Sequence, residues 1–314
     1  MPKVSVIVPN YNHAEYLVQR LEGILNQTFQ DIEVILLDDC SNDNSLDVIN
    51  IYAKQSKVSQ CIVNTKNSGS PFKQWQKGIE LAKGDFIWIA ESDDDASQTF
   101  LEDMLTELQN KNADLIFCAS TYVDSSNKLI GAAHDDSTSW VKTGKEAIFD
   151  YFITKNKIRN TSSVLFRKSC IERIPVVMFS MKYCGDWYFY STLSLIENVK
   201  IAYLNKPLNF FRQHTNNVST NAEKNGLAIF EGLMVLKLIW KQLHITKHDT
   251  GYVFIFNFWY KNILDNYLNR QEIGKHKKAI LLLRLWTIDI NLFYKVIFTK
   301  IHYLFLQYRT SIIF

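Results

Sequence analysis

The sequence has few cysteines, no signal peptide and no strong excess of charge, and each absence excludes a class of protein. The cysteines are odd in number and include no Cys-x-x-Cys pair, so we expect neither a disulfide framework nor a zinc site. They are Cys40, Cys61, Cys118, Cys170 and Cys184. The first residues contain no basic start, apolar core of signal-peptide length or cleavage site, so secretion by that route is not expected. We therefore expect a protein of the reducing cytoplasm.

Charge and apolar runs exclude two further classes. The chain has 35 Lys and Arg residues against 32 Asp and Glu residues, a formal net charge of +3 that does not suggest nucleic-acid binding. No window reaches the roughly 18 uncharged apolar residues that a membrane-spanning helix needs. What the chain does have is 314 residues, of which 47% are hydrophobic. This is enough for one α/β domain with a substantial core and an appendage.

The first 120 residues alternate between short apolar runs typical of strands and helical patterns. The apolar runs are 4–8, 33–37, 61–63, 86–90 and 114–119, and the helical patterns are 16–25, 45–52, 75–82 and 99–109. This alternation predicts an α/β fold, with a mainly parallel sheet and helices on both faces. Ligands of such sheets bind at the carboxyl ends of the strands, so the loops after Val8, Leu37 and Ile89 form the candidate site.

The pattern of residues changes in the later part of the chain. Polar residues from 124 to 143 predict a loop-rich excursion, and beyond about residue 220 aromatic helical patterns dominate. We therefore place a domain boundary near residue 220.

Each of the three candidate loops carries residues suited to a nucleotide or a metal ion. The first strand ends in Pro-Asn-Tyr-Asn at 9–12, the second enters a loop at 38–45 that begins with two aspartates, and the fourth enters Glu-Ser-Asp-Asp-Asp at 91–95. A carboxylate can accept a hydrogen bond from the N–H of uracil, and a tyrosine can stack on the ring. Carboxylate oxygens also suit Mg²⁺ or Mn²⁺ beside a diphosphate.

These segments resemble the nucleotide-binding half of family 2 glycosyltransferases, inverting enzymes of the GT-A fold that include the bacterial cell-surface polysaccharide type. The resemblance rests on Val-Ser-Val-Ile-Val-Pro-Asn-Tyr-Asn at 4–12, on the paired-aspartate loop and on Gly-Asp-Phe-Ile-Trp-Ile-Ala at 84–90. It covers residues 3–120 strongly and extends more loosely to about 220. It implies a GT-A catalytic domain over 1–220, with a nucleotide-sugar-binding half over 1–120 and an acceptor half over 121–220. A helical region over 221–314 would follow.

The resemblance implies roles in donor binding for residues of the first two loops. Asp39 would accept a hydrogen bond from the base while Tyr11 stacks on it, with Pro9 and Asp38 at the same two strand ends. Asn67 stands where the family has an Asn-x-Gly segment, and an ordinary turn is an equally good interpretation of this position.

For the third loop the resemblance implies that Asp93 binds the metal, with Asp94 as the alternative ligand. Glu91 replaces the first acid of the family's Asp-x-Asp motif, for which the resemblance implies contact with the ribose, and Ser92 lies beside it. Acid clusters in loops are commonly solvated or cap helices. Three suitable strand ends in one sheet argue against that interpretation here.

Inverting transfer needs a base that removes the proton of the acceptor hydroxyl as its oxygen attacks the anomeric carbon. Cys-Gly-Asp-Trp-Tyr at 184–188 resembles the family's acidic-Asp-Trp segment, with Gly185 replacing the first acid. The resemblance implies that Asp186 is this base, whereas the local sequence also suits a helix N-cap. Trp187 fits either a contact with the acceptor sugar or a place in the core.

Phe-Arg-Gln-His at 211–214 resembles the family's Arg-x-His element. Arginine suits bidentate contact with phosphate, and histidine can bind metal or phosphate. The resemblance implies that Arg212 and His214 contact the donor diphosphate, and a solvated loop is the alternative.

The last segment of the chain predicts an amphipathic helix. At about 100° per residue, one set of polar residues falls within about 40°: Arg284, Asn291, Lys295, His302 and Arg309. A broad apolar face remains, formed by Ile280, Leu283, Leu285, Trp286, Phe293, Ile297, Phe298, Leu304 and Phe305. Three lysines just before it, Lys275, Lys277 and Lys278, would attract anionic lipid. We expect peripheral binding to the cytoplasmic face of a membrane, and a packed helix or a dimer contact is the alternative.

These patterns together predict a metal-dependent glycosyltransferase that uses Mn²⁺ or Mg²⁺ and a nucleotide-sugar donor, with uridine as the expected base. The acceptor would be a saccharide or a lipid-linked saccharide destined for a cell-surface polysaccharide. Two alternatives are a membrane-associated scaffold of the same fold with a decayed site and a sugar nucleotidylyltransferase. The second lacks support because no Gly-rich, Arg-containing phosphate loop lies near the N-terminus.

Overall fold

The computed structural model describes residues 1–133, 136–214, 227–245, 250–263, 267–269, 273–288, 290–299 and 301. The chain divides into two compact units. The first consists of Met1–Phe152 and Asn156–Asn217, and the second of Ile153–Lys155 and Val218–Phe314. The division at 217 and 218 lies close to the boundary expected at 220. The short segment Ile153–Lys155 belongs to the second unit because the Trp259 indole nitrogen donates to the backbone oxygen of Thr154 at 3.0 Å.

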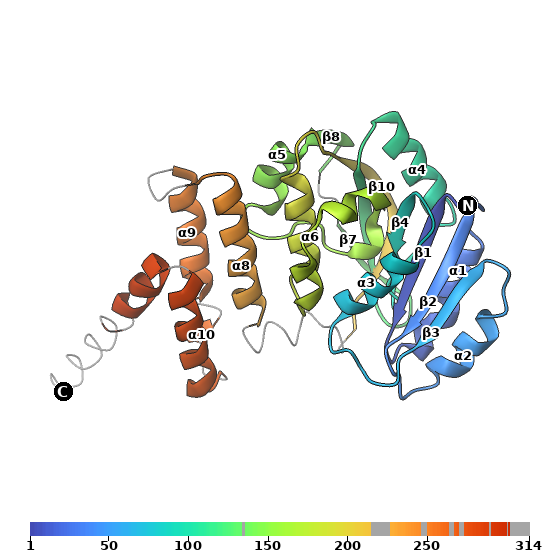
Figure 1. Ribbon diagram of the computed structural model, residues 1–314, viewed down its shortest axis with the longest axis horizontal. Helices are drawn as coiled ribbons and strands as arrows, with labels where there is room; N and C mark the ends of the chain where they lie inside the picture. The colour runs from blue at the N-terminus through green and yellow to red at the C-terminus, as the bar shows by residue number, and fades with distance from the viewer. Residues whose placement is uncertain are drawn as a thin grey trace. The chain divides into compact units, whose positions relative to one another are not determined.

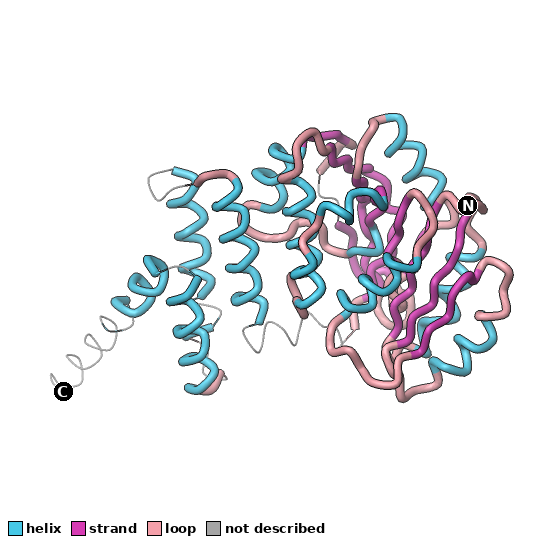
Figure 2. The backbone as a smooth tube through the Cα atoms, in the orientation of Figure 1, coloured by secondary structure: helices cyan, strands magenta, loops and turns pink. Residues whose placement is uncertain are grey.

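The first unit is built on a ten-stranded sheet with the order β3-β2-β1-β4-β9-β6-β10-β5, in which β7 pairs with β6 and β8 pairs with β10 (Figures 1 and 2). The strands are β1 (Val4–Asn10), β2 (Ile32–Asp38), β3 (Val58–Val63), β4 (Phe86–Ile89), β5 (Asp95–Ala96), β6 (Leu115–Val123), β7 (Leu129–Ala133), β8 (Trp140–Thr143), β9 (Val164–Arg167) and β10 (Lys200–Arg212). The pairs β1 with β2, β1 with β4, β2 with β3 and β6 with β10 are parallel. The prediction of a mainly parallel α/β sheet is confirmed.

Helices cover both faces of this sheet, as expected for strands that are buried on both sides. In β1, Val6 and Val8 belong to one core cluster together with Leu17 of α1. Ile7 points to the opposite face, where Gly78 of α3 approaches so closely that a Cβ there would lie 2.3 Å from the Ile7 side chain. The helices of the unit are α1 (Ala14–Leu25), α2 (Ser45–Tyr52), α3 (Pro71–Leu81), α4 (Phe100–Asn110), α5 (Gly144–Ala147) and α6 (Gly185–Ser194).

The register of the parallel strands brings their polar loops to one edge of the sheet. Asn10 lies opposite Asp38 in the pairing of β1 with β2, and Ile7 lies opposite Ile89 in the pairing of β1 with β4. The loops that begin at Tyr11, Asp39 and Ala90 therefore leave adjacent strands in the same direction, which is the arrangement expected from the sequence.

Two parts of the sheet differ from the expectation. The segment 124–143 contains β7 and β8 in place of a loop-rich excursion, because their main chains pair with β6 and β10. The short strand β9 lies antiparallel between β4 and β6. The side chains of β7 and β8 are largely exposed, with Leu129 64% exposed, so no buried apolar run marks these two strands in the sequence. The apolar side chains of β9 are buried, but the run is only three residues long.

The second unit is helical over its described residues. It contains α8 (Leu227–Gln242), α9 (Thr250–Ile263), α10 (Lys275–Ile288) and a further helical segment over residues 290–299. Its core includes Leu281 and Leu285 of α10 and Leu292 and Val296 of the segment 290–299. Within the residues that the structure describes, no helix is long and apolar enough to cross a membrane.

Candidate functional site

The loops after β1 and β2 are tied together by a buried carboxylate. Asn10 Nδ2 donates to Asp38 Oδ2 at 2.8 Å, and Asp38 also accepts from the backbone nitrogen of Ser41 at 2.9 Å and from its hydroxyl at 2.6 Å. Pro9 lies buried inside β1, whereas the next loop residue, Tyr11, is 44% exposed. Asp38 therefore shapes the loops, and the ring of Tyr11 stands free to contact a ligand.

Asp39 is the centre of a dense hydrogen-bond network. Its Oδ1 accepts from Asn64 Nδ2 at 2.7 Å, from Ser68 N at 2.9 Å and from Gln74 Nε2 at 2.8 Å. Its Oδ2 accepts from the Ser68 hydroxyl at 2.7 Å. With one donor among the described residues, Oδ2 keeps capacity for a further N–H. Asn67 Nδ2 donates to the Asp39 carbonyl at 3.2 Å, which brings the segment expected near the donor next to this aspartate.

The acid loop after β4 places its first two side chains in protein contacts. Glu91 Oε1 accepts from the indole nitrogen of Trp75 at 2.9 Å. Burial and the neighbouring Asp93 carboxylate raise the pKa of Glu91 to about 8. Ser92 is 1% exposed and its hydroxyl lies 2.8 Å from Nδ1 of His13. Glu91 is half-buried and its carboxylate already accepts a hydrogen bond, which supports a positioning role in the loop more directly than contact with a ribose.

Asp94 differs from Asp93 in what surrounds its carboxylate. Its Oδ2 accepts from Asn160 Nδ2 at 2.7 Å and from the Ser162 hydroxyl at 2.6 Å, and its Oδ1 accepts from the backbone nitrogen of Arg212 at 3.0 Å. Burial and the Asp93 charge raise the pKa of Asp94 to about 6. Both oxygens thus join the segment before β9 and the end of β10 to the acid loop, and the geometry favours Asp93 as the residue that could bind metal.

The side chain of Arg212 is buried and supports the acid loop, residues 91–95, through hydrogen bonds. Nε donates to the Asp93 carbonyl at 2.7 Å, Nη1 to the Asp124 carbonyl at 2.9 Å and Nη2 to Gln19 Oε1 at 3.3 Å. The guanidinium also lies 4.6 Å from the ring centre of Tyr16. Direct contact with a diphosphate, as expected from the sequence, would require these bonds to be exchanged.

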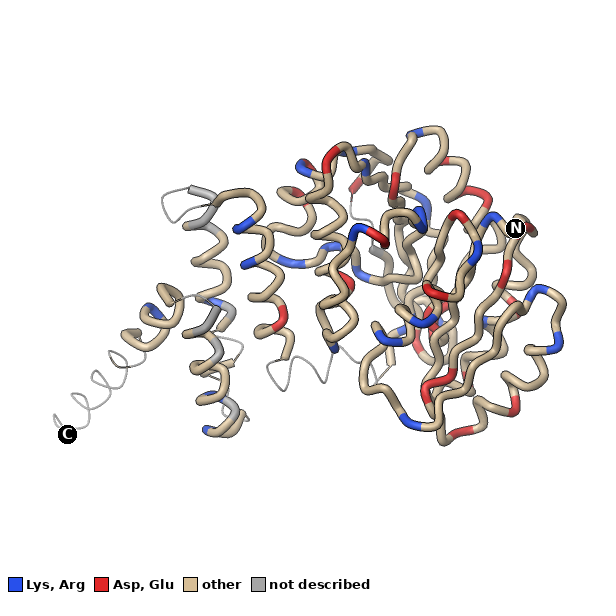
Figure 3. The backbone as a smooth tube through the Cα atoms, viewed as in Figure 1, with Lys and Arg blue, Asp and Glu red and all other residues tan. Residues whose placement is uncertain are grey.

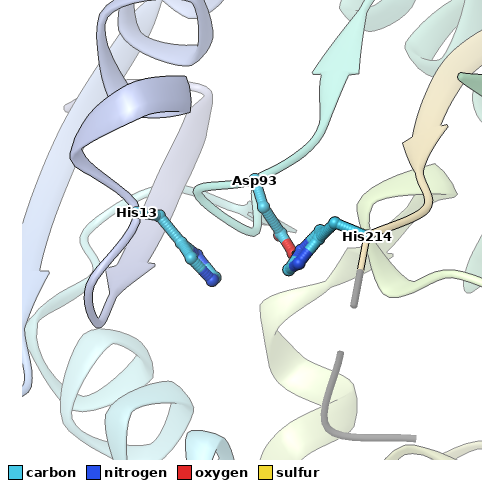
Figure 4. A group of neighbouring side chains, drawn as sticks. All are labelled: His13, Asp93 and His214. Carbon is cyan, nitrogen blue, oxygen red and sulfur yellow. The ribbon is translucent and has the colours of Figure 1, made fainter. Parts of the chain in front are cut away.

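His13, Asp93 and His214 form a group of possible metal ligands (Figure 4). One ligand atom of each lies within 4.8 Å of the others, and His214 Nε2 lies 2.9 Å from Asp93 Oδ2. Burial alone would raise the pKa of Asp93, but the hydrogen bond with His214 and the nearby His13 outweigh it and hold the pKa below its ordinary value. Two ligands bound at about 2.1 Å and at right angles are about 3 Å apart, so the Asp93 and His214 atoms fit one ion.

Sequence reasoning missed His13 and Arg20. His13 stands at the N-cap of α1, three residues beyond the end of β1, so its position at the strand edge was the available signal. Arg20 is fully buried in α1, lies 4.9 Å from the ring centre of Trp88, and its three nitrogens have no hydrogen-bond partner among the described residues. Burial lowers the pKa of Arg20, and the charges of Asp94 and Asp95 oppose this shift. Arg20 is thus an internal positive charge behind the acid loop, and an amphipathic helix pattern gives no sign of it.

Asp186 lies in the first turn of α6 and is half-buried. The N-cap of this helix is Cys184, so the helix-cap interpretation of Asp186 is wrong. Its Oδ2 accepts from Asn156 Nδ2 at 2.8 Å and its Oδ1 from the Trp187 backbone nitrogen at 2.7 Å. Burial raises the pKa of the nearby Tyr190 phenol, and the charges of Asp186 and Glu91 raise it further. Both carboxyl groups therefore act on the same region.

The residues beside Asp186 explain one departure from the family's motif. A Cβ at Gly185 would lie 2.6 Å from the ring of Phe72. The aromatic ring of α3 therefore occupies the space in which the family's acidic side chain would start. Trp187 is buried and its indole nitrogen donates to the Phe152 carbonyl at 3.0 Å, which makes it a core residue.

Comparison with known proteins supplies the family. The family model of glycosyl transferase family 2 matches residues 5–174. The glycosyltransferase GlyG of Streptococcus pneumoniae serotype 4 is 28% identical over 198 residues, which are 63% of this chain and 56% of GlyG. The chain thus spans little more than half the length of this curated relative.

Solved structures support the fold. TarS of Staphylococcus aureus, residues 1–349 with UDP-GlcNAc, gives a TM-score of 0.68 at 19% identity and covers 92% of this chain and 82% of that one. TarS is a poly(ribitol-phosphate) β-N-acetylglucosaminyltransferase. Its sequence is 31% identical to this chain over 118 residues, which are 37% of this chain and 20% of TarS. The mannosyltransferase PcManGT of Pyrobaculum calidifontis, with GDP-Man and Mn²⁺, gives a TM-score of 0.56 at 14% identity and covers 99% of this chain and 83% of that one.

Proposed function

The chain belongs to glycosyl transferase family 2, and from that membership we propose that it transfers a sugar from a nucleotide-diphosphate donor to a hydroxyl of a saccharide acceptor, with inversion at the anomeric carbon. One observation carries the proposal: Asp93 and His214 lie within hydrogen-bonding distance, 2.9 Å apart, at the sheet edge that also holds the paired-aspartate loop. A uridine donor is supported by the TarS complex with UDP-GlcNAc. The proposed acceptor is a saccharide or lipid-linked saccharide of a cell-surface polysaccharide.

The donor would be held by residues of three loops. The ring of Tyr11 stacks on the base, Oδ2 of Asp39 accepts from the base N–H, and Asn67 keeps its loop against Asp39. Asp93 and His214 would hold Mn²⁺ or Mg²⁺, which when bound would supply positive charge next to the leaving diphosphate. Arg212 acts on this site through the Asp93 carbonyl as a positioning residue.

Asp186 is the proposed base. It accepts the proton of the acceptor hydroxyl while the hydroxyl oxygen forms a bond to the anomeric carbon and the bond from that carbon to the diphosphate oxygen breaks. Asn156 holds one carboxylate oxygen at 2.8 Å and so fixes the orientation of the group. The nucleoside diphosphate leaves with the electron pair of the broken bond.

A scaffold with a decayed site is the alternative function. It is motivated by Glu91 and Gly185, which stand where the family has other residues. Gly185 has a packing reason in the ring of Phe72, and Glu91 keeps a carboxylate in the loop. The convergence of Asp93 and His214, and the partnered carboxylates of Asp39 and Asp186, support an active enzyme.

The test of the proposed function is a panel of UDP-, GDP- and dTDP-sugars, each measured for binding and for slow hydrolysis with and without Mn²⁺. We expect one nucleotide class to bind more tightly with Mn²⁺ and to be hydrolysed slowly without an acceptor. Binding of no member of the panel, at millimolar concentration with Mn²⁺ present, would favour the scaffold.

Membrane association remains part of the proposal and is supported by the second unit. The residues 221–314 include 13 Lys and Arg against 6 Asp and Glu, a formal net charge of +7, and basic residues predominate over the described part of this unit (Figure 3). Several apolar side chains of α10 and of residues 290–301 are exposed, and we call this set the exposed stripe. Its members recur every three or four residues and are Leu283, Trp286, Ile290, Tyr294, Phe298 and Ile301.

The exposed stripe refines the face expected from the sequence. Leu285 was expected on that face and is buried, whereas Leu283 is 71% and Phe298 66% exposed. Phe293 and Ile297 are half-buried, and positions 304 and 305 lie outside the described residues. Leu283 and Phe298 are therefore the residues to substitute in a test of membrane binding.

We expect the full chain to sediment with phosphatidylglycerol vesicles and to remain bound in high salt, because apolar burial is not screened while charge attraction is. Each large apolar side chain contributes about 1.5–3 kcal/mol on burial. The double substitution Leu283→Glu with Phe298→Glu should therefore weaken vesicle binding at least about a hundredfold. The matched control is Gln242→Glu with Asn291→Glu, which makes the same charge change at exposed polar positions and should stay bound. A full chain that ignores the vesicles would contradict the membrane proposal.

A further inference from the structure

His13 is held in place by residues that are not themselves candidate metal ligands. It lies at the N-cap of α1, and its Nδ1 is 2.8 Å from the hydroxyl of Ser92, which is 1% exposed. The hydroxyl engages one ring nitrogen and leaves Nε2 as the nitrogen that can bind an ion. A buried hydrogen-bond partner of this kind fixes the ring orientation of metal-binding histidines in general.

The rings of His13 and His214 are arranged so that both can reach one ion. Their centres are 5.6 Å apart and their planes lie at 82°, so the rings do not stack. The lone pair of a ring nitrogen lies in the ring plane, and ring edges that face one space can share an ion there, as the view of the three side chains indicates (Figure 4). Tyr16 contacts both rings, with centre distances of 6.2 Å to His13 and 5.6 Å to His214.

We propose that His13 is a third protein ligand of the donor-site cation, and that it makes this site select Mn²⁺ or Co²⁺ over Mg²⁺. The three ligand atoms lie within 4.8 Å of one another, so a small inward movement of the rings completes the set. The proposal rests on the proposed function only in placing this cation beside the donor diphosphate.

The chemistry of the ligands carries the selectivity. Imidazole suits transition metals, whereas Mg²⁺ prefers oxygen ligands and keeps several waters. With Asp93 and His214 alone, half of the protein ligands would be oxygen and Mg²⁺ would compete well. With His13 included, two of the three protein ligand atoms are nitrogen. Ser92 acts on the metal through His13, and loss of such a partner costs roughly tenfold to a hundredfold in metal affinity.

The test measures metal binding by the full chain without nucleotide, using Co²⁺ absorption, Mn²⁺ electron paramagnetic resonance and Mg²⁺ competition. We expect His13→Gln to weaken Co²⁺ and Mn²⁺ binding about tenfold or more, while Mg²⁺ binding changes less than about twofold. Ser92→Ala should weaken Co²⁺ binding by about tenfold. His276→Gln, which removes an exposed imidazole in α10, is the matched control and should bind all three ions as the unaltered chain does.

A second measurement needs no substitution. In the ¹⁵N-labelled chain, addition of Zn²⁺ should shift the Nε2 resonances of His13 and His214 together, at the same metal equivalence. A shift of His214 alone, equal Co²⁺ affinity in His13→Gln, or an equal loss of Mg²⁺ and Co²⁺ binding would overturn the assignment. Failure of the unaltered chain to bind Co²⁺ at millimolar concentration would overturn it as well. None of these results would exclude sugar transfer, because the cation can also arrive bound to the donor and be held by Asp93 and His214.

Discussion

Asp93→Ala is expected to lower sugar transfer by about three orders of magnitude or more and to remove most of the Mn²⁺-dependent gain in nucleotide binding. A bound cation contributes several kcal/mol to stabilising charge on a leaving diphosphate, and Asp93 is the carboxylate that lies with His214 at 2.9 Å. The measurements are transfer rate and nucleotide affinity with Mn²⁺ and with EDTA. Full activity of Asp93→Ala, or of the unaltered chain in excess EDTA, would contradict the metal assignment.

Two comparison variants separate loss of metal from loss of fold. Asp31→Ala removes an exposed carboxylate and should change neither stability nor activity. Asp94→Ala removes a carboxylate that accepts three hydrogen bonds, and should lower the free energy of unfolding by about 2–4 kcal/mol because its donors are left buried and unpaired. Asp93→Ala should keep the thermal midpoint of the unaltered chain much more closely than Asp94→Ala does.

Asp186→Asn is expected to lower the turnover number by about two orders of magnitude or more and to leave the donor dissociation constant nearly unchanged. The amide keeps the shape of the side chain but has no basic carboxylate to accept the acceptor proton. Single-turnover transfer and equilibrium binding of the donor separate the two effects. Asn156→Ala should give a smaller fall, of about tenfold, because the carboxylate stays but loses the hydrogen bond that orients it.

Two results would contradict the base assignment. If donor affinity falls together with turnover, Asp186 contacts the donor or supports the fold. If the anomeric carbon of the product retains the configuration of the donor sugar, as determined by NMR of the fresh product, then direct displacement with Asp186 as the base is wrong.

The sheet edge that carries the proposed nucleotide site could be predicted from the sequence because its signals are local. Val4–Val8 and Phe86–Ile89 are continuous apolar runs, and parallel strands that are buried on both faces leave such runs. Polar residues follow each run within two positions, so the edge at which the loops meet follows from strand direction alone. Strand direction also places His13 at that edge, but a single histidine is too weak a signal to predict a metal ligand.

The remaining parts depend on contacts between distant segments. The sequence of β9 gives no information that it enters between β4 and β6, because strand order is set by packing over the whole sheet. Arg20 looks like a polar position in a helix, yet it is buried against Trp88. The sequence predicts a set of carboxylates, but it gives no sign that Asp94 accepts hydrogen bonds from Asn160 and Ser162, which leaves Asp93 as the proposed metal ligand.

The place of β10 in the sheet has a consequence for how the protein is made. The last residue of this strand, Arg212, is hydrogen-bonded to the loop at residues 91–95 across 119 positions of sequence, and His214 lies two residues after it. A nascent chain that has emerged through residue 174 already contains both base-binding loops and the whole segment matched by the family model. It still lacks β10 and the imidazole of His214. Because domains fold as units while the chain is synthesised, we expect the proposed cation site to be complete only after β10 has joined the sheet.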